Sequence, residues 1–389
     1  MTRLLIATTV VAALRAFFVP MAHHFRAMGW QVDGMAQGAS GCPQCNAAFD
    51  HVWEIDWSRN PLAAQNLVAV PQQLRKVVTK QAYDLVHVST PVAAFVARYA
   101  LNGLRQQGKL KIIYTAQGFH FYQGGSPWKN AAFLTLEKLA GRWTDYLVVV
   151  NHEDEEAAKH YSLVPPPQVR YIPGTGLNLE RFHPDAVPES EVVRVRQALG
   201  LSAETPLFLS VAELIPRKRP CDILQAFAAL QPSTAHLAFA GAGVLLEEMQ
   251  QFAIHLGVQD RVHFLGLRSD IPTLMRSAIA TILASEQEGL PNCVMESLCL
   301  GVPVIGSQIR GTQDLLDGGY GFLFPVGSVA KLTEAMTLAL EQPEATQLIG
   351  KRSWNRMAPY GLHPVLKQYE ALYTEALNSV RANEILLPV

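Results

Sequence analysis

Two carboxylates, Glu288 and Glu296, stand with seven residues between them in the stretch Ser285–Leu298. The apolar run Ile279–Ala284 before them is typical of a buried strand, and the run after them is typical of a helix. The tight turn between the two elements follows Glu288 directly and consists of Gly289, Leu290, Pro291 and Asn292. A helix that begins near Asn292 would present unpaired backbone N–H groups and partial positive charge to a phosphate.

The position of these two carboxylates predicts what the phosphate belongs to. Glu288 precedes the anion site and Glu296 follows it by about one helical turn. One carboxylate can hold the hydroxyls of a sugar and the other the hydroxyls of a ribose, which together describe a nucleotide-sugar. The alternative is that both are solvated surface carboxylates near the start of a helix.

Three consecutive cations, Arg217, Lys218 and Arg219, follow the strand-like run Leu207–Val211. Negative charge builds on a leaving diphosphate as a glycosidic bond breaks, so cations at this place would stabilise it. A solvated basic turn is the alternative interpretation of the same residues.

The apolar pattern along the chain predicts the elements that position these side chains. Strand-like and helix-like segments alternate in both halves, which indicates two domains, each with a parallel sheet covered on both faces. At 389 residues the chain is too long for one ordinary core. We expect a first domain over residues 1–183, a linker over 184–190, a second domain over 191–360, and a C-terminal helix over 361–389 that crosses back to the first domain.

Composition limits the classes of partner. A net charge of −1 argues against general nucleic-acid binding, so no nucleic-acid partner is expected. The five cysteines are few and scattered, which suits a reducing cytoplasm, and Cys42 and Cys45 are interpreted as loop residues rather than a redox pair. No apolar stretch is long enough to span a bilayer.

A peripheral contact with the inner membrane is expected on the cytoplasmic face. Scattered surface residues are the alternative interpretation of the side chains that suggest it. These are Leu104, Arg105, Lys109, Lys111, Trp128 and Lys129.

The Glu-x7-Glu spacing resembles the signature of the retaining glycosyltransferases of family 4, and the resemblance covers nearly the whole chain. It implies the GT-B fold, in which two doubly wound Rossmann-like domains face a cleft. It also implies transfer of a sugar, with retention, from a nucleoside diphosphate donor, a UDP-sugar by expectation, to a carbohydrate or lipid-linked oligosaccharide acceptor. Glu288 would then orient the hydroxyls of the donor sugar and Glu296 those of the ribose.

Other donor residues follow from the same resemblance. Lys218 falls on the lysine that grips the diphosphate in the family, whereas the family's arginine is replaced by Glu213, so Arg217 or Arg219 would substitute. The backbone around Gly266, Leu267 and Arg268 resembles the base-binding element, although a plain turn before a helix fits these residues too. Gly289, Leu290, Pro291 and Asn292 would line the phosphate or the sugar.

The first half resembles the capsular and exopolysaccharide members of the family, through the segment Tyr114–Tyr122. The family's histidine beside the transferring sugar is Gln117 here, and an amide cannot carry a proton. His120 follows three residues on and is the other candidate for a direct catalytic role, although a packed histidine is the alternative. The segment Thr8–Leu14 replaces a double-glycine loop that would lie in the cleft.

The carboxylates Glu153–Glu156 form no Asp-x-Asp motif, so neither a metal ion nor a cofactor is expected. Two other functions remain open. One is a UDP-sugar 2-epimerase on the same architecture, which would act without an acceptor. The other is a non-catalytic nucleotide-sugar-binding partner subunit, which the departures at Gln117 and Glu213 keep open.

Overall fold

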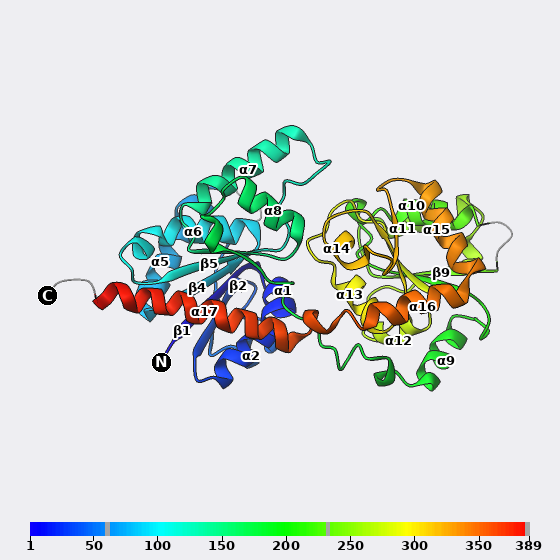
Figure 1. Ribbon diagram of the computed structural model, residues 1–389, viewed down its shortest axis with the longest axis horizontal. Coiled ribbons are helices and arrows are strands. Elements are labelled where there is room, and N and C mark those ends of the chain that lie inside the picture. Colours follow the sequence, from blue (N-terminus) through cyan, green and yellow to red (C-terminus); the bar gives the residue numbers. More distant parts are fainter. Residues whose placement is uncertain (59–62, 231–233, 386–389) are drawn as a thin grey trace. The chain divides into compact units, whose positions relative to one another are not determined.

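The structure, a computed structural model, describes residues 1–58, 63–230 and 234–385 (Figure 1). The chain divides into two compact units. Unit 1 comprises Met1–Gly176 and the segment that begins at Leu362, and unit 2 comprises Leu177–Gly361. Residues 386–389, at the end of the expected C-terminal segment, lie outside the described residues.

The sheet of unit 1 has the strand order β3-β2-β1-β4-β5-β6-β7, and its pairings among the described residues are parallel. Its strands are β1 (Arg3–Val10), β2 (Gln31–Gln37), β3 (His51–Glu54), β4 (Leu85–Ser89), β5 (Lys111–Ala116), β6 (Tyr146–Val149) and β7 (Val169–Tyr171). Leu5 and Ala7 of β1 belong to one apolar layer, whereas Leu4 and Ile6 belong to the other. Both faces of this interior strand are therefore covered, as the apolar runs predict.

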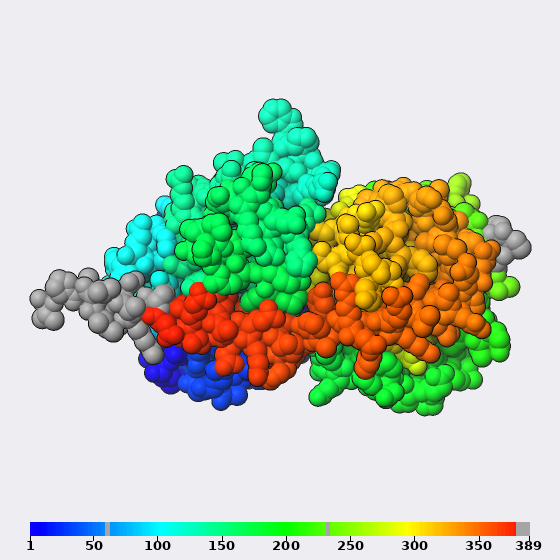
Figure 2. Space-filling model, viewed as in Figure 1, coloured from blue at the N-terminus to red at the C-terminus, as the bar shows by residue number. Residues whose placement is uncertain are grey.

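Helices cover both faces of this sheet. They are α1 (Val11–Ala13), a π-helix (Leu14–Phe18), α2 (Val19–Ala27), α3 (Pro43–Ala48), α4 (Ala64–Leu67), α5 (Ala69–Gln81), α6 (Pro91–Gln106), α7 (Pro127–Gly141), α8 (His152–His160) and α17 (Leu362–Ile385). The last of these, drawn in red, lies along the surface of unit 1 (Figures 1 and 2). It buries Val365, Tyr369 and Tyr373 in the layer that also holds Phe25 of α2.

The segment Thr8–Leu14 is not a loop, which corrects the expectation from sequence. β1 continues to Val10, and α1 begins at the next residue. The reason is local: β-branched residues favour an extended strand, and no glycine is present to take the positive φ of a tight turn. The backbone N–H of Thr9 donates to Oγ1 of Thr90 at 2.8 Å, which fixes the end of the strand.

Cys45 is not a loop residue either, which corrects the expectation, whereas Cys42 lies outside the helix. Cys42 is the N-cap of α3, where its sulfur accepts from the backbone N–H of Cys45 at 3.4 Å, and Cys45 lies inside the helix. Pro43 at the first helical position, with its fixed φ, favours a helix start at this point. Both thiols are free and buried.

The sheet of unit 2 has the order β10-β9-β8-β11-β12-β13, again with parallel pairings in the described residues. Its strands are β8 (Leu207–Val211), β9 (His236–Ala240), β10 (Val262–Phe264), β11 (Ala280–Leu283), β12 (Val304–Ser307) and β13 (Phe322–Phe324). Its α-helices are α9 (Glu189–Ala198), α10 (Pro220–Ala228), α11 (Leu246–His255), α12 (Ile271–Arg276), α13 (Asn292–Cys299), α14 (Thr312–Leu316), α15 (Val329–Glu341) and α16 (Pro343–Trp354).

Short 3₁₀ turns complete both units. They are Pro166–Gln168 in unit 1, and Pro184–Ala186, Pro216–Lys218, Gln259–Arg261 and Ala358–Tyr360 in unit 2.

The boundaries of the units differ from those expected at 183 and 191. Leu177 and Phe182 already pack in the core of unit 2, and Val187, within the expected linker, is buried in the same core. Prolines at 184 and 188 indicate a linker, but Phe182 and Val187, before and between them, are buried in the core of unit 2. The burial of those side chains decides where the unit begins.

A buried polar cluster ties α17 to the sheet of unit 1. Nδ1 of His87 on β4 lies 2.5 Å from the Tyr373 hydroxyl, and its Nε2 lies 2.7 Å from Oγ1 of Thr115. The Tyr369 hydroxyl donates to the carbonyl of Gly174 at 3.3 Å. Burial lowers the pKa of His87 to about 3, so the ring is neutral in the folded protein at neutral pH.

This cluster predicts acid sensitivity. Between pH 6.5 and pH 3 the unfolded chain binds a proton at His87 that the folded chain does not, so its contribution to stability falls as pH falls. The loss is at most about 1.4 kcal/mol per pH unit in that window. Urea unfolding from pH 7 to pH 4 should therefore show a smaller pH slope for His87→Gln than for the natural protein.

The matched control is His23→Gln, which changes an exposed histidine on α2 of the same unit. Its pH slope should equal that of the natural protein. Equal slopes for His87→Gln and the natural protein would contradict the assignment of acid sensitivity to this cluster.

Candidate functional site

Glu288 and Lys218 are in contact on loops at the carboxyl ends of two neighbouring strands of unit 2. Lys218 follows β8, and Glu288 lies between β11 and α13. The Lys218 ammonium forms a charged hydrogen bond with Oε1 of Glu288, and the Arg217 guanidinium lies 3.6 Å from the same oxygen. The Lys218 side chain is 14% exposed and that of Glu288 is 11% exposed, so this pair is only weakly screened by water.

Backbone groups hold these two loops together. The Glu286 N–H donates to the carbonyl of Arg217 at 2.9 Å, and the Arg217 guanidinium donates to the carbonyl of Gln287. Arg310, which is 4% exposed, donates from Nε to the carbonyl of Glu288 at 3.1 Å. Arg310 is thus a buried support of the Glu288 loop.

Glycines allow the loops at this edge to approach one another. A Cβ on Gly241 would lie 1.9 Å from the carbonyl oxygen of Ala212, and one on Gly243 would lie 2.3 Å from that of Leu214. A Cβ on Gly311 would lie 1.9 Å from the carbonyl oxygen of Gly289. Gly241 and Gly243, which form a Gly-x-Gly turn after β9, therefore both contact the loop between β8 and Lys218 and help to position that loop.

Arg219 has a structural role. This bears on which arginine, Arg217 or Arg219, could bind the diphosphate in place of the family's arginine, which is Glu213 here. Its guanidinium bonds Asp222 at 2.6 Å and Glu286 at 2.7 Å, so its charge is already matched by two carboxylates. Arg217 is 41% exposed and keeps its charge at the surface of the edge. Glu213 is exposed. Arg217 is therefore the better candidate to contact a diphosphate beside Lys218.

Helix α13 begins at Asn292, as the sequence predicts, with Pro291 as its N-cap. Asn292 is exposed at the first helical position, whereas Leu290 packs against the core. Glu296 lies in the second turn, and burial raises its pKa to about 7, opposed by the positive charge of Arg181. Glu296 is half-buried, and a carboxylate that is largely removed from water and bonds no described side chain costs free energy when ionised, which is typical of a functional position.

The predicted base-binding residues lie on the loop after β10. Gly266 has φ of +63°, and its backbone forms an antiparallel bridge with Gly241, so this loop lies beside the Gly-x-Gly turn. Leu267 is 85% exposed. Arg268 bonds Asp270 at 2.6 Å. A Cβ on Gly266 would have no atom within 4 Å, and Leu267 is exposed to solvent, so a flat ring could reach the backbone here.

Gln117 and His120 belong to unit 1, on the loop after β5. Asp154 of α8 accepts from the backbone N–H of Phe119 at 3.0 Å and fixes this loop. Nε2 of Gln117 is buried and has no hydrogen-bond partner among the described residues. His120 is exposed, and its ring centre lies 5.1 Å from that of Phe133. A buried amide without a partner is suited to bind a hydroxyl.

Sequence reasoning did not find two features of this site. The charge of Arg181 acts on Glu296 from 115 positions away along the chain, and no spacing rule reveals such a pair. The support of Arg219 by Asp222 has a detectable signal, because arginine and aspartate stand three residues apart at the start of a helix. Within the described residues, no group of three His, Cys, Asp or Glu side chains is arranged to hold a metal ion.

Comparison with known proteins agrees with this geometry. The family model for glycosyl transferases group 1 matches residues 193–356, and a glycosyl transferase 4-like domain matches residues 14–175. EpsD of Bacillus subtilis, which bears a glycosyltransferase name, is 34% identical over 353 residues, which is 90% of each chain. An Escherichia coli UDP-Gal:α-D-GlcNAc-diphosphoundecaprenol α-1,3-galactosyltransferase is 26% identical over 269 residues, 68% of each chain.

The fold also agrees with solved structures. The structure of Anabaena HepE in complex with UDP superposes with a TM-score of 0.79 at 18% identity, over 96% of this chain and all of that one. The chain has the GT-B fold and belongs to the group 1, family-4 type glycosyltransferases. It is a hexosyltransferase.

The half-buried carboxylate Glu296 predicts an effect on stability. Below pH 4.5 Glu296 is protonated in both states, whereas above pH 7 the folded protein must bury its charge. Glu296→Gln removes that charge, so it should stabilise the ligand-free protein at pH 8 by an amount on the order of 1–3 kcal/mol. The gain should disappear near pH 4.5, as measured by urea unfolding at both pH values.

Glu213→Gln, at an exposed carboxylate of the same edge, provides the control and should leave stability unchanged at both pH values. A Glu296→Gln protein that is no more stable than the natural one at pH 8 would contradict the desolvated state of this carboxylate.

Proposed function

We propose that this enzyme transfers a hexose, with retention of anomeric configuration, from a UDP-sugar to a lipid-linked oligosaccharide. The observation that carries the donor assignment is the cluster of Lys218, Arg217 and Glu288 beside the first turn of α13. It combines a cation for a diphosphate, helix N–H groups for an anion, and a carboxylate for sugar hydroxyls.

Each residue has a distinct task in this proposal. Lys218 and Arg217 bind the diphosphate, and Glu288, released by Lys218, accepts hydrogen bonds from hydroxyls of the hexose. Glu296 accepts from the two ribose hydroxyls, and the backbone at Gly266 pairs with the base. UDP is chosen as the nucleotide because the E. coli relative uses UDP-Gal by name and HepE was solved with UDP.

The transfer step balances without a protein nucleophile. The bond between the anomeric carbon and the diphosphate oxygen breaks while the acceptor hydroxyl bonds to that carbon on the same face. The acceptor proton passes to the departing phosphate oxygen. Lys218 and Arg217 stabilise the charge that develops on the diphosphate, which is the main contribution that the protein makes in this scheme.

The names of two relatives support the choice of a lipid-linked acceptor. The E. coli relative acts by name on a diphosphoundecaprenol-linked sugar, and a Campylobacter jejuni relative, 23% identical over 247 residues, acts by name on another. Gln117 in unit 1 would bind a hydroxyl of the transferring sugar through its buried amide. It cannot act as an acid or base, so the scheme assigns it no proton.

The donor site predicts a nucleotide-dependent gain in stability. UDP or a UDP-sugar at a hundred times its dissociation constant should add about 2.7 kcal/mol, seen as a higher melting temperature, and GDP and ADP should add less. Lys218→Ala should abolish the shift and lower kcat/KM for transfer by about 100-fold or more, because it removes a charge aimed at the leaving group.

The control variant is Lys331→Ala, which changes an exposed lysine on α15 that pairs with Glu334. It should bind and transfer like the natural protein. A shift with UDP but neither transfer nor donor hydrolysis would show a binding subunit instead of an enzyme. A shift with GDP or ADP alone would overturn the choice of nucleotide.

An exposed apolar surface on α7 supports our proposal of a peripheral location at the cytoplasmic face of the membrane. Trp128 is 87% exposed, and Leu136 and Leu139 of the same helix are each more than 40% exposed. The helix also carries exposed Lys129 and Lys138. An exposed apolar stripe flanked by cations suits an anionic lipid surface. No described helix is long and apolar enough to cross a bilayer.

Leu104, Arg105 and Lys111 contribute less than expected to this surface, whereas Lys109 is exposed. Arg105 and Lys111 pair with Asp145, which weakens their attraction to an anionic lipid surface. Leu104 packs against the core.

Co-sedimentation with vesicles that contain phosphatidylglycerol tests this surface. The natural protein should bind, and Trp128→Ser combined with Leu136→Ser should reduce the bound fraction at least fivefold, because about 25 cal/mol per Å² of buried apolar area is lost. Val244→Ser, at an equally exposed apolar residue of unit 2, should bind as the natural protein does. Equal sedimentation of all three proteins would overturn the assignment.

A further inference from the structure

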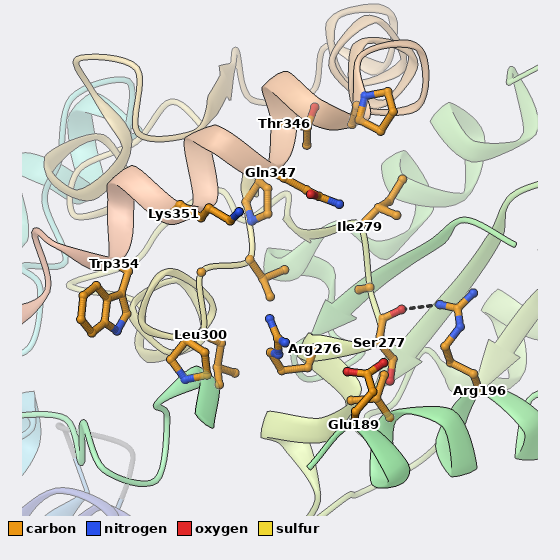
Figure 3. A pocket seen from close by; sticks show the side chains of 18 of the residues that line it. Glu189, Arg196, Arg276, Ser277, Ile279, Leu300, Thr346, Gln347, Lys351 and Trp354 are labelled. Carbon is orange, nitrogen blue, oxygen red and sulfur yellow. Dashed lines mark hydrogen bonds between the residues drawn. The ribbon is translucent and has the colours of Figure 1, made fainter. Parts of the chain in front are cut away.

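A cavity lies within unit 2 (Figure 3). Its volume is about 710 Å³. Ile279 and Pro303, which immediately precede β11 and β12, line it, so it lies at the amino ends of these strands. Lys218 and Glu288 lie at the carboxyl ends. The strand direction therefore places the two regions at opposite edges of one sheet.

The cavity contains cations that are not matched by carboxylates. Arg276 ends α12 and Lys351 lies on α16, and neither forms an ion pair with any residue that the structure describes. Nε of Arg276 is buried and has no acceptor within the described part of the chain. Figure 3 shows both side chains extending into the same space. A buried guanidinium N–H without an acceptor costs free energy, which an oxyanion in the cavity would recover.

A third cation is fixed in place. The Arg196 guanidinium donates to the carbonyls of Ser277 at 2.6 Å and of Ser202 at 2.6 Å. Carbonyl oxygens orient this group without neutralising its charge. The acids of the lining, Asp185 and Glu189, are exposed. The negative charges of Glu189 and Glu204 act on Arg196, so the cations without a carboxylate partner are Arg276 and Lys351.

Neutral groups indicate that the ligand is larger than an inorganic anion. The Thr346 side chain is 2% exposed, and its hydroxyl has no hydrogen-bond partner among the described residues. Gln347 adds an amide from the same helix (Figure 3). Trp354 is 41% exposed and meets His183 edge-on at 5.5 Å, which gives an aromatic wall at the rim. The volume lies in the range of small-molecule sites.

From this combination we propose that the cavity is a second ligand site, which binds a sugar phosphate. Arg276 and Lys351 hold the phosphate, Thr346 and Gln347 bond sugar hydroxyls, and Trp354 packs against the ring. Arg196, whose guanidinium nitrogens all donate to backbone carbonyls, contributes only its positive charge. The site is separate from the donor site and does not depend on the identity of the donor.

Isothermal titration with glucose 1-phosphate in the presence of saturating UDP tests the proposal. UDP keeps the donor site occupied, so the remaining signal reports the cavity. The natural protein should bind glucose 1-phosphate at least tenfold more tightly than glucose or inorganic phosphate. Lys351→Ala should weaken binding at least tenfold, and Arg276→Lys should retain part of it because charge is kept while the planar donor is lost.

Two controls separate this site from the donor site. Lys331→Ala should bind glucose 1-phosphate as the natural protein does, and so should Lys218→Ala, whose donor site is impaired. No binding of glucose 1-phosphate at millimolar concentration, or binding that Lys351→Ala leaves unchanged, would overturn the proposal. Equal affinity for inorganic phosphate and glucose 1-phosphate would overturn the sugar part of it.

Discussion

The carboxyl edge of unit 2 depends on close backbone contacts that exclude a side chain. The carbonyl oxygens of Ala212, Leu214 and Gly289 occupy the places where Cβ atoms of Gly241, Gly243 and Gly311 would be. Because of these contacts, the loop after β9 packs against the loop after β8, and the loop after β12 packs against the loop after β11. Lys218, at the end of the 3₁₀ turn Pro216–Lys218, then meets Glu288. The chemistry of the edge therefore depends on residues that carry no functional group.

Much of this organisation follows from sequence because it depends on local patterns. The apolar run Ile279–Ala284 and the proline at 291 predict where β11 ends and α13 begins, and the structure agrees within a residue. The cations at 217–219 and the carboxylate at 288 could be predicted to lie at one edge, since both follow parallel strands. Their direct contact could not be predicted, because it depends on the register of β8 beside β11 and on Gly243.

Errors arose where a local rule competed with packing. Proline-rich residues 184–190 suggested a linker, but burial of Val187 places them in the core of unit 2. The segment Thr8–Leu14 contains no glycine, and here the strand passes directly into a helix. Sequence could not predict this because it depends on the hydrogen bond from the Thr9 N–H to Thr90. The cavity at the amino edge had no sequence signal at all, because Arg276 and Lys351 are 75 residues apart and neither belongs to a motif.

The contact between Lys218 and Glu288 also bears on the end of a catalytic cycle. In the ligand-free enzyme the two charges satisfy each other. On the proposed donor placement, a bound UDP-sugar separates them, giving Lys218 to the diphosphate and Glu288 to the hexose. Once the hexose has left, UDP still holds Lys218, but Glu288, only 11% exposed, has lost its partner. Re-forming the pair then favours departure of the spent nucleotide. The same contact that closes the empty site would thus limit inhibition by its own product.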